Sequence, residues 1–190
     1  PLGGRPVVEV DLASRRSRKR VMERLAGGGG KVVPTGLAHG TVTAVVAGRP
    51  VEITTLRRDV ETDGRHAVVA FTDDWREDAA RRDFTINAMS LARDGAVFDY
   101  FGGLEDLRVG RLRFVGDPAR RVAEDYLRVL RYFRFFAGYG GVEPDAATQV
   151  ALTGALPHVT SLSVERVWHE LRRIMAAPDP VASVALMDRL

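Results

Sequence analysis

The chain has 190 residues, of which 28 are Lys or Arg, 25 are Asp or Glu, four are His and none is Cys. This length allows one large domain or two small ones, and 45% hydrophobic with 28% charged residues is the composition of a soluble globular protein. The absence of Cys excludes disulfide scaffolds and the common structural zinc sites, and it favours a cytoplasmic location. No apolar stretch approaches the roughly 18 residues of a membrane span, whereas a sequence pI of about 9.7 favours a polyanionic partner.

The first 115 residues have the pattern of short strands and helices. Residues 7–12 alternate apolar and acidic side chains, which is typical of a strand with one solvent-exposed face. A helix is expected over residues 19–26, ended by the glycine run 27–30. Residues 47–50 predict a hairpin turn, and the polar segment 59–65 predicts a loop. Further strands are predicted at 31–34, 41–47, 51–56 and 67–71.

From residue 117 the spacing of apolar residues becomes helical, and helices are predicted at 118–139, 145–152, 163–177 and 180–190. In the third helix an apolar stripe is expected to pack in the core: Val164, Val167, Trp168, Leu171, Ile174 and Met175. Strands followed by helices predict an α+β fold, or two small domains joined near residue 115. The chain begins Pro1-Leu2 without Met and ends inside a predicted helix, so we expect it to be part of a longer protein.

Glu9 and Asp11 lie two residues apart in the first predicted strand, so their side chains point to the same face. Adjacent carboxylates repel each other unless a cation lies between them, and a hard ion such as Mg²⁺ prefers oxygen ligands. Glu52 repeats the pattern on a strand that is expected to be adjacent. Three carboxylates from two strands would suit two-metal phosphoryl transfer. A solvated sheet edge is the alternative explanation for Glu9 and Asp11.

Two arginine-rich segments indicate an anionic ligand. Residues 81–89, RRDFTINAM, place two Arg beside Asp83, which can orient one of them toward triphosphate oxygens. The alternative is a surface Arg pair beside a helix cap. In the predicted helix 118–139, Arg128, Arg131 and Arg134 form a ridge at i+3 spacing, away from the apolar side. Like charges at this spacing destabilise a helix, and an anionic ligand would offset that cost.

Asp125 and Arg128, one turn apart in that predicted helix, can also select a base. Cytosine and adenine both present an amino donor beside a ring-nitrogen acceptor. A carboxylate accepts from the first group and a guanidinium donates to the second. Guanine and uracil present the reverse pattern, so the pair would accept C and A without a template. The alternative is that Asp125 is an early-helix acid favoured by the helix dipole.

The chain resembles the class II tRNA nucleotidyltransferase and bacterial poly(A) polymerase family from about Gly4 to Leu190. Residues 81–89 match the family segment RRDFTINAM letter for letter. Later matches are DYFGGLEDL at 99–107, VGDP at 115–118 and EDYLRVLRYFR at 124–134. The resemblance implies a nucleotidyltransferase palm, or head, with a mixed β-sheet and helices over residues 1–115. An all-helical neck would follow over residues 116–190, before body and tail domains that hold the tRNA.

The resemblance also implies roles for single residues. Glu9 and Asp11 would bind the metal, Glu52 would be an auxiliary third catalytic acid, and His39 would lie in a structural TGxxHGT loop. The incoming nucleotide would contact Arg82, Asp125, Arg128, Arg131 and Arg134. The family more often has Asp at the position of Glu9. It also has a Gly-Gly pair and an Arg-Asp about a dozen residues before the acidic pair, a motif missing from this chain.

The implied reaction is template-independent addition of C and A from CTP and ATP to the 3′ end of tRNA, with Mg²⁺ as cofactor and without a membrane partner. A bacterial poly(A) polymerase acting on another RNA 3′ end shares these motifs and is the nearest alternative. A non-catalytic RNA-binding fragment is the third alternative. The missing glycine motif favours that fragment, and the arginine ridge argues against it.

Overall fold

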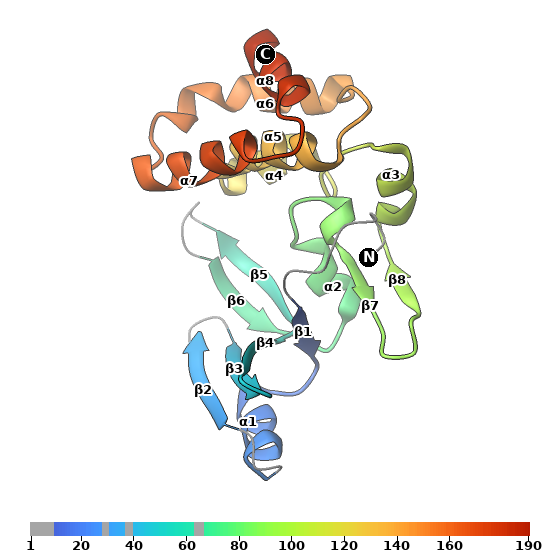
Figure 1. Cartoon of the computed structure of the whole chain (residues 1–190), viewed down its shortest axis with the longest axis vertical. Coiled ribbons are helices and arrows are strands. Elements are labelled where there is room, and N and C mark those ends of the chain that lie inside the picture. Colours follow the sequence, from blue (N-terminus) through green and yellow to red (C-terminus); the bar gives the residue numbers. More distant parts are fainter. Residues whose placement is uncertain (1–9, 28–30, 37–39, 63–66) are drawn as a thin grey trace. The chain divides into compact units, whose positions relative to one another are not determined.

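The computed structural model describes residues 10–27, 31–36, 40–62 and 67–190 (Figure 1). They belong to two compact units, one comprising Pro1–Glu61 and Val68–Asp78, the other Thr62–Ala67 and Ala79–Leu190. The α+β class predicted from the sequence is confirmed, because strands dominate the first unit and helices the second. No helix within the described ranges is long and apolar enough to cross a membrane.

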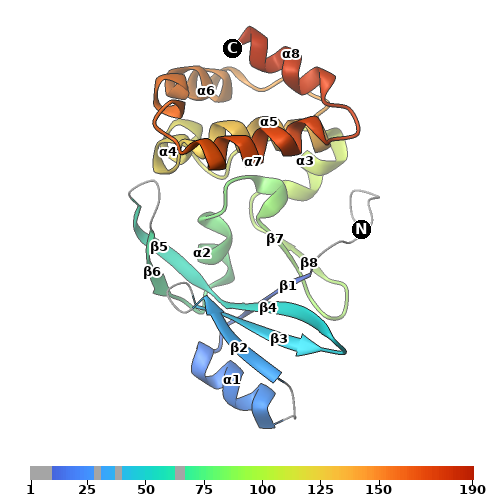
Figure 2. The same cartoon turned by 60° about the vertical axis from the view of Figure 1, so that its left-hand side comes forward.

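The first unit is built on a four-stranded sheet of order β1-β4-β3-β2. Its strands are β1 (Asp11–Ser14), β2 (Lys31–Gly36), β3 (Thr41–Val46) and β4 (Arg49–Thr55). β1 is parallel to β4, and the other two pairings are antiparallel. Helix α1 (Arg18–Gly27) packs against β2 and β3 (Figure 2). Val21 of the helix and the alternate residues Val42 and Ala44 of β3 are buried, as expected for one apolar face of a strand.

The turn between β3 and β4 is shorter than predicted. Only Ala47 and Gly48 lie in it, and both have positive φ, 50° and 77°. Such two-residue turns match the twist of the strands they join. β4 therefore begins at Arg49, and Arg49 and Pro50 pair with Val46 and Val45.

A second pair of strands, β5 (Arg57–Thr62) and β6 (Ala67–Phe71), forms its own two-stranded sheet. The sequence predicted β6 correctly, but the predicted loop over 59–65 is wrong for residues 59–62, and residues 63–66 lie outside the described part. The sequence of β5, RRDVET, has no apolar alternation, which is why the strand was not predicted. Helix α2 (Trp75–Ala80) follows β6.

The second unit begins with a 3₁₀ turn, η2 (Thr85–Asn87), and a short hairpin of β7 (Met89–Leu91) and β8 (Val97–Asp99). Six helices follow: α3 (Gly103–Val109), α4 (Pro118–Glu124), α5 (Leu127–Tyr139), α6 (Ala146–Val159), α7 (Val164–Met175) and α8 (Val181–Arg189). α5 packs against α6, α7 and α8, and α4 packs against α6 (Figure 2). α6 extends beyond its predicted end at residue 152.

The helix predicted over 118–139 is two helices, α4 and α5, separated by Asp125 and Tyr126. Asp125 has an extended backbone, with φ −158° and ψ 107°. Its side chain accepts a hydrogen bond from the backbone N–H of Leu127, and its carbonyl accepts one from that of Arg128. Aspartate competes for backbone donors in this way and thereby starts a new helix. Periodicity missed the break because the apolar residues continue on the same face.

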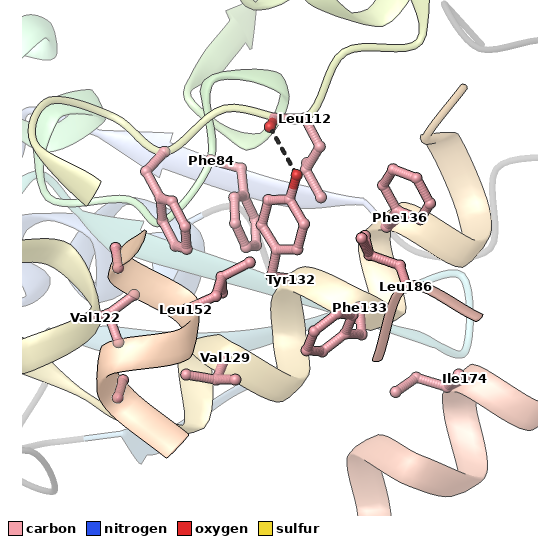
Figure 3. Close-up of a cluster of buried hydrophobic side chains, with 13 residues drawn as sticks. Phe84, Leu112, Val122, Val129, Tyr132, Phe133, Phe136, Leu152, Ile174 and Leu186 are labelled. Atoms are coloured by element: carbon pink, nitrogen blue, oxygen red, sulfur yellow. Dashed lines mark hydrogen bonds between the residues drawn. The ribbon is translucent and has the colours of Figure 1, made fainter. Parts of the chain in front are cut away.

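The core of the second unit joins residues before 115 to the helices after it (Figure 3). Phe84 and Phe114 lie with ring centroids 4.9 Å apart, and the Tyr132 ring of α5 is 5.9 and 5.6 Å from them. The Tyr132 hydroxyl donates to the Leu112 carbonyl at 3.3 Å. Residues 79–115 therefore pack with the helices in one compact unit. The division into a head of residues 1–115 and a neck of residues 116–190 stays a prediction.

The apolar stripe of α7 is only partly buried, so its prediction as core is wrong for half of it. Ile174 is 1% exposed, but Val164, Trp168 and Met175 are 78%, 63% and 65% exposed. Periodicity predicts that a helix has an apolar face. How much of that face becomes buried depends on how the neighbouring helices pack against it.

Gly103, the first residue of α3, is buried, and a Cβ there would lie 2.1 Å from the carbonyl oxygen of Thr85. We expect Gly103→Ala to lower the free energy of unfolding by about 1–3 kcal/mol, because backbone must move. The matched control is Gly154→Ala in α6, where a Cβ meets nothing within 4 Å. It should raise stability by about 0.5–1 kcal/mol. Urea unfolding measures both, and equal stabilities would contradict the steric argument.

Candidate active site

Two of the predicted acidic residues are brought together in the sheet of the first unit. Asp11 of β1 and Glu52 of β4 are register partners, and such partners point their side chains to the same face. Both residues are exposed. The sequence-based expectation that their strands are adjacent is confirmed. Glu9 lies outside the described residues.

The Asp11–Glu52 pair fits a divalent cation such as Mg²⁺. Both side chains offer hard oxygen ligands, and a cation between them would relieve the repulsion of neighbouring carboxylates. In the described part of the chain no group of three or more His, Cys, Asp or Glu side chains is placed to hold a metal ion. A three-carboxylate site would therefore require Glu9 as well.

The second unit contains a cavity of about 580 Å³. Five arginines line it: Arg81, Arg82, Arg128, Arg131 and Arg166. The carboxylates of Asp83 and Asp125 and the side chains of Asn87, Leu127 and Phe135 complete its wall. We call it the arginine cavity. The excess of guanidinium groups over carboxylates suits an anion with several oxygens, such as a triphosphate.

Asp83 fixes Arg131 at the wall of this cavity. Its Oδ2 accepts hydrogen bonds from Nε and Nη2 of Arg131 at 2.7 and 2.5 Å, and its Oδ1 accepts from the Asn87 amide and the Phe84 N–H. Burial raises the pKa of the Asp83 carboxyl, but the charge of Arg131 and these hydrogen bonds outweigh it, so the pKa lies below its ordinary value. The sequence predicted that Asp83 orients a neighbouring arginine. In the structure these hydrogen bonds join Asp83 to Arg131, an arginine 48 residues away.

Asp125 and Arg128 both line the cavity. The prediction that they form a pair on one helix face is wrong. Asp125 lies before α5, and both of its carboxylate oxygens accept hydrogen bonds from Arg166 Nη2 of α7, at 3.1 and 2.9 Å. Arg128 Nη1 donates to Glu124 Oε2 at 2.5 Å and to the Arg121 carbonyl at 2.8 Å. The break between α4 and α5 explains the difference, because it takes Asp125 out of the helical arrangement that the argument assumed.

Arg134 does not belong to the cavity wall. Its guanidinium forms an ion pair with Glu170 of α7 at 3.1 Å, and the two side chains are 13% and 4% exposed. Burial lowers the pKa of Arg134, and the charge of Glu170 acts in the opposite direction. The guanidinium also lies over the Phe135 ring, 4.6 Å from its centroid. Each arginine of the ridge thus forms an ion pair with a different acid. Arg128, Arg131 and Arg134 pair with Glu124, Asp83 and Glu170 respectively.

Sequence reasoning missed three cavity residues, Arg166, Leu127 and Phe135. Arg166 belongs to the polar side of the amphipathic helix α7, where a solvated charge is the ordinary expectation. Its partner Asp125 is 41 residues away, so no local spacing marks the pair. Arg81 and Arg82, which the sequence singled out as candidates for binding triphosphate oxygens, line the cavity, and Arg82 is exposed.

Because the pKa of folded Asp83 is lowered, its ionised form stabilises the fold above the unfolded pKa, and this contribution is lost as pH falls through the folded pKa. We expect Asp83→Asn to lower the free energy of unfolding at pH 7 by about 2–3 kcal/mol, since it weakens a largely buried ion pair. The deficit should shrink below about pH 4. Asp188→Asn, at an exposed position of α8, is the control and should change stability by less than about 0.5 kcal/mol. Urea unfolding at several pH values measures the free energy of unfolding of each variant. If the stability lost in Asp83→Asn does not change with pH, the lowered pKa of Asp83 is contradicted.

Comparison with known proteins agrees with this arrangement. The family described as "Poly A polymerase head domain" matches residues 2–113, and the one described as "Probable RNA and SrmB- binding site of polymerase A" matches residues 141–190. Human mitochondrial CCA tRNA nucleotidyltransferase 1 is 44% identical over 180 residues, which cover 92% of this chain and 41% of the human protein. The CCA-adding enzyme of Streptococcus gordonii is 41% identical over 180 residues, covering 92% and 43%. The chain thus spans less than half the length of these relatives.

Solved structures give the same result. A CCA-adding enzyme from Bacillus stearothermophilus in complex with CTP superposes with a TM-score of 0.84 at 33% identity, covering 96% of this chain and 43% of that one. A tRNA nucleotidyltransferase complexed with a primer tRNA and an incoming ATP analogue has a TM-score of 0.78 at 26% identity, covering 98% and 53%. Since the head-domain family matches more than half of the residues, the chain belongs to the poly A polymerase head domain family, as the sequence motifs implied.

Proposed function

We propose that the protein adds C and A from CTP and ATP to the 3′ end of tRNA, in the cytoplasm and with Mg²⁺. The arginine cavity carries this proposal, because it offers several guanidinium groups at one nucleotide-sized site. Two relatives support it: the matching structures are described as a CCA-adding enzyme with CTP and a tRNA nucleotidyltransferase with primer tRNA and an ATP analogue. A poly(A) polymerase would use ATP alone, so the nucleotide preference separates the alternatives.

The carboxylate pair would serve the metal. Asp11 and Glu52, with Glu9, would hold Mg²⁺, which when bound favours ionisation of the attacking 3′-hydroxyl and neutralises charge on the leaving pyrophosphate. Asp11 and Glu52 are the two acidic residues within the described strands of this sheet, and they are register partners. We therefore assign metal binding to this pair, together with Glu9.

The arginine cavity would bind the nucleotide. Arg82 and Arg131 suit the triphosphate, and Asp83 holds Arg131 in one orientation before the ligand arrives. Such prior orientation reduces the entropy lost on binding. Asp125 and Arg128 are the candidates for base contacts, since both line the cavity. Arg134, expected as a further nucleotide contact, is better placed to join α5 to α7 through Glu170.

We expect Asp11→Ala to leave less than about a tenth of wild-type turnover, which corresponds to about 1.4 kcal/mol of barrier, because no other group would replace the lost metal ligand. Stability should barely change, since the substitution removes one of two repelling carboxylates. Asp73→Ala, an exposed aspartate of the same unit, is the control and should keep full activity. The assay measures incorporation of labelled CMP and AMP into tRNA lacking CCA. A fully active Asp11→Ala variant would refute the assignment.

The base-reading role of Asp125 predicts a change in selectivity. Asp125→Ala removes the acceptor for the amino group of C or A, so the preference for CTP over UTP should fall about tenfold or more. It also removes a helix-capping contact and the partner of Arg166. Asp145→Ala, which removes the N-cap contact to Thr148 in α6, is therefore the matched control for lost stability. Competition between CTP and UTP in one reaction measures the ratio, and an unaltered ratio in Asp125→Ala would rule out base reading.

A further inference from the structure

A run of cations follows directly after strand β1, which carries Asp11. Between Asp11 and Glu23 the sequence contains no acid, but it contains five basic residues: Arg15, Arg16, Arg18, Lys19 and Arg20. Arg24 follows one turn later in α1. We call these six residues the α1 basic surface. The nucleotide-binding and metal-binding residues proposed above make no use of it.

The backbone of this run is held in place although most of its side chains are exposed. The Ser14 carbonyl accepts a hydrogen bond from the Leu56 N–H at 2.9 Å, and the Arg16 carbonyl accepts one from the Thr55 hydroxyl at 3.1 Å. The Ser17 carbonyl accepts from the Val21 N–H and begins the helix. The cations are therefore presented from a fixed segment of backbone.

All of these charges except Arg24, which lies in the last turn of α1, have positions that are unfavourable for the isolated fold. The first turn of α1 contains no acid, whereas the partial positive charge of a helix N-terminus favours acids there and disfavours cations. Arg20 and Glu23 form an ion pair at 3.5 Å, but their side chains are 73% and 48% exposed, and such pairs contribute little. An anionic partner would offset the accumulated repulsion.

The adjacent cavity is not the place for that partner. Arg15, Ser17 and Arg58 line it, but so do Asp73 and Glu77, and the mixed charges do not favour an anion. The outer side of α1 is different, because Arg16, Lys19, Arg20 and Arg24 are all exposed there. A surface of this kind binds successive phosphates of a nucleic-acid backbone.

We infer that the α1 basic surface binds the phosphate backbone of the RNA substrate. The choice of RNA rests on the proposed function. A membrane surface is disfavoured because α1 offers no exposed apolar face: Val21 is buried, and Met22 and Leu25 are half-buried.

The test uses the triple variant Arg16→Gln, Lys19→Gln, Arg20→Gln. Its affinity for tRNA lacking CCA, measured by fluorescence anisotropy at about 0.1 M salt, should fall at least about tenfold. The slope of log Kd against log salt should decrease by about 2–3, as expected for three lost phosphate contacts. Affinity for CTP should not change. Thermal stability should stay equal or rise slightly, because the variant removes cations near a helix N-terminus.

The matched control removes three exposed arginines elsewhere: Arg49→Gln, Arg93→Gln, Arg108→Gln. It should change tRNA affinity less than about threefold. Equal losses in the two triple variants, or none in the first, would overturn the inference. If the first triple variant loses binding to phosphatidylserine vesicles but keeps its affinity for tRNA, the surface binds a membrane and the inference is overturned. The binding assay needs no catalysis, so a wild-type protein that binds tRNA through this surface without transferring nucleotides would refute only the proposed function.

Discussion

The ion pair between Asp83 and Arg131 is the contact on which the second unit depends. It ties the RRDFTINAM segment to α5 across 48 residues of sequence, at the wall of the arginine cavity. The buried rings of Phe84 and Tyr132, one residue further along each segment, pack beside it. A polar contact thus sets the cavity wall and an apolar contact sets the core. Breaking the first would leave a charge with poor solvation at a largely buried site.

Ion pairs of this kind, between an arginine of α5 and an acid from another segment, occur along the whole helix. Its three arginines meet carboxylates from three different places: the end of α4, the segment before η2, and the middle of α7. Each pair offsets the repulsion that the i+3 spacing of like charges would otherwise cause. The arginine ridge therefore organises its neighbours as well as offering charge to a ligand. Arg131 can do both because its side chain remains 31% exposed, while Arg134, at 13%, is committed to Glu170.

The α1 basic surface has the opposite character. Five of its six cations lie before α1 or in its first turn, where a helix N-terminus disfavours them, and most of the six are exposed on a fixed backbone. Charge that stabilises the fold is paired and partly buried, as in the arginine cavity. Charge that costs stability and remains in water is better explained by a partner, and an RNA backbone is the partner that the proposed function supplies.

Local sequence determined most of the elements and the chemical character of the site. Runs of β-forming residues predicted β3, β4 and β6, the glycine run predicted the end of α1, and helical spacing of apolar residues predicted α7 and α8. The motifs singled out Arg82, Asp125, Arg128 and Arg131, and the structure brings these four residues to one cavity. Tertiary structure alone decided the partners. The pairing of Asp125 with Arg166, the burial of Arg134 against Glu170 and the exposure of Trp168 all depend on residues tens of positions away. Periodicity reports which face of a helix is polar, but the acid that neutralises a given arginine is set by which helices pack together, and that is a property of the folded core.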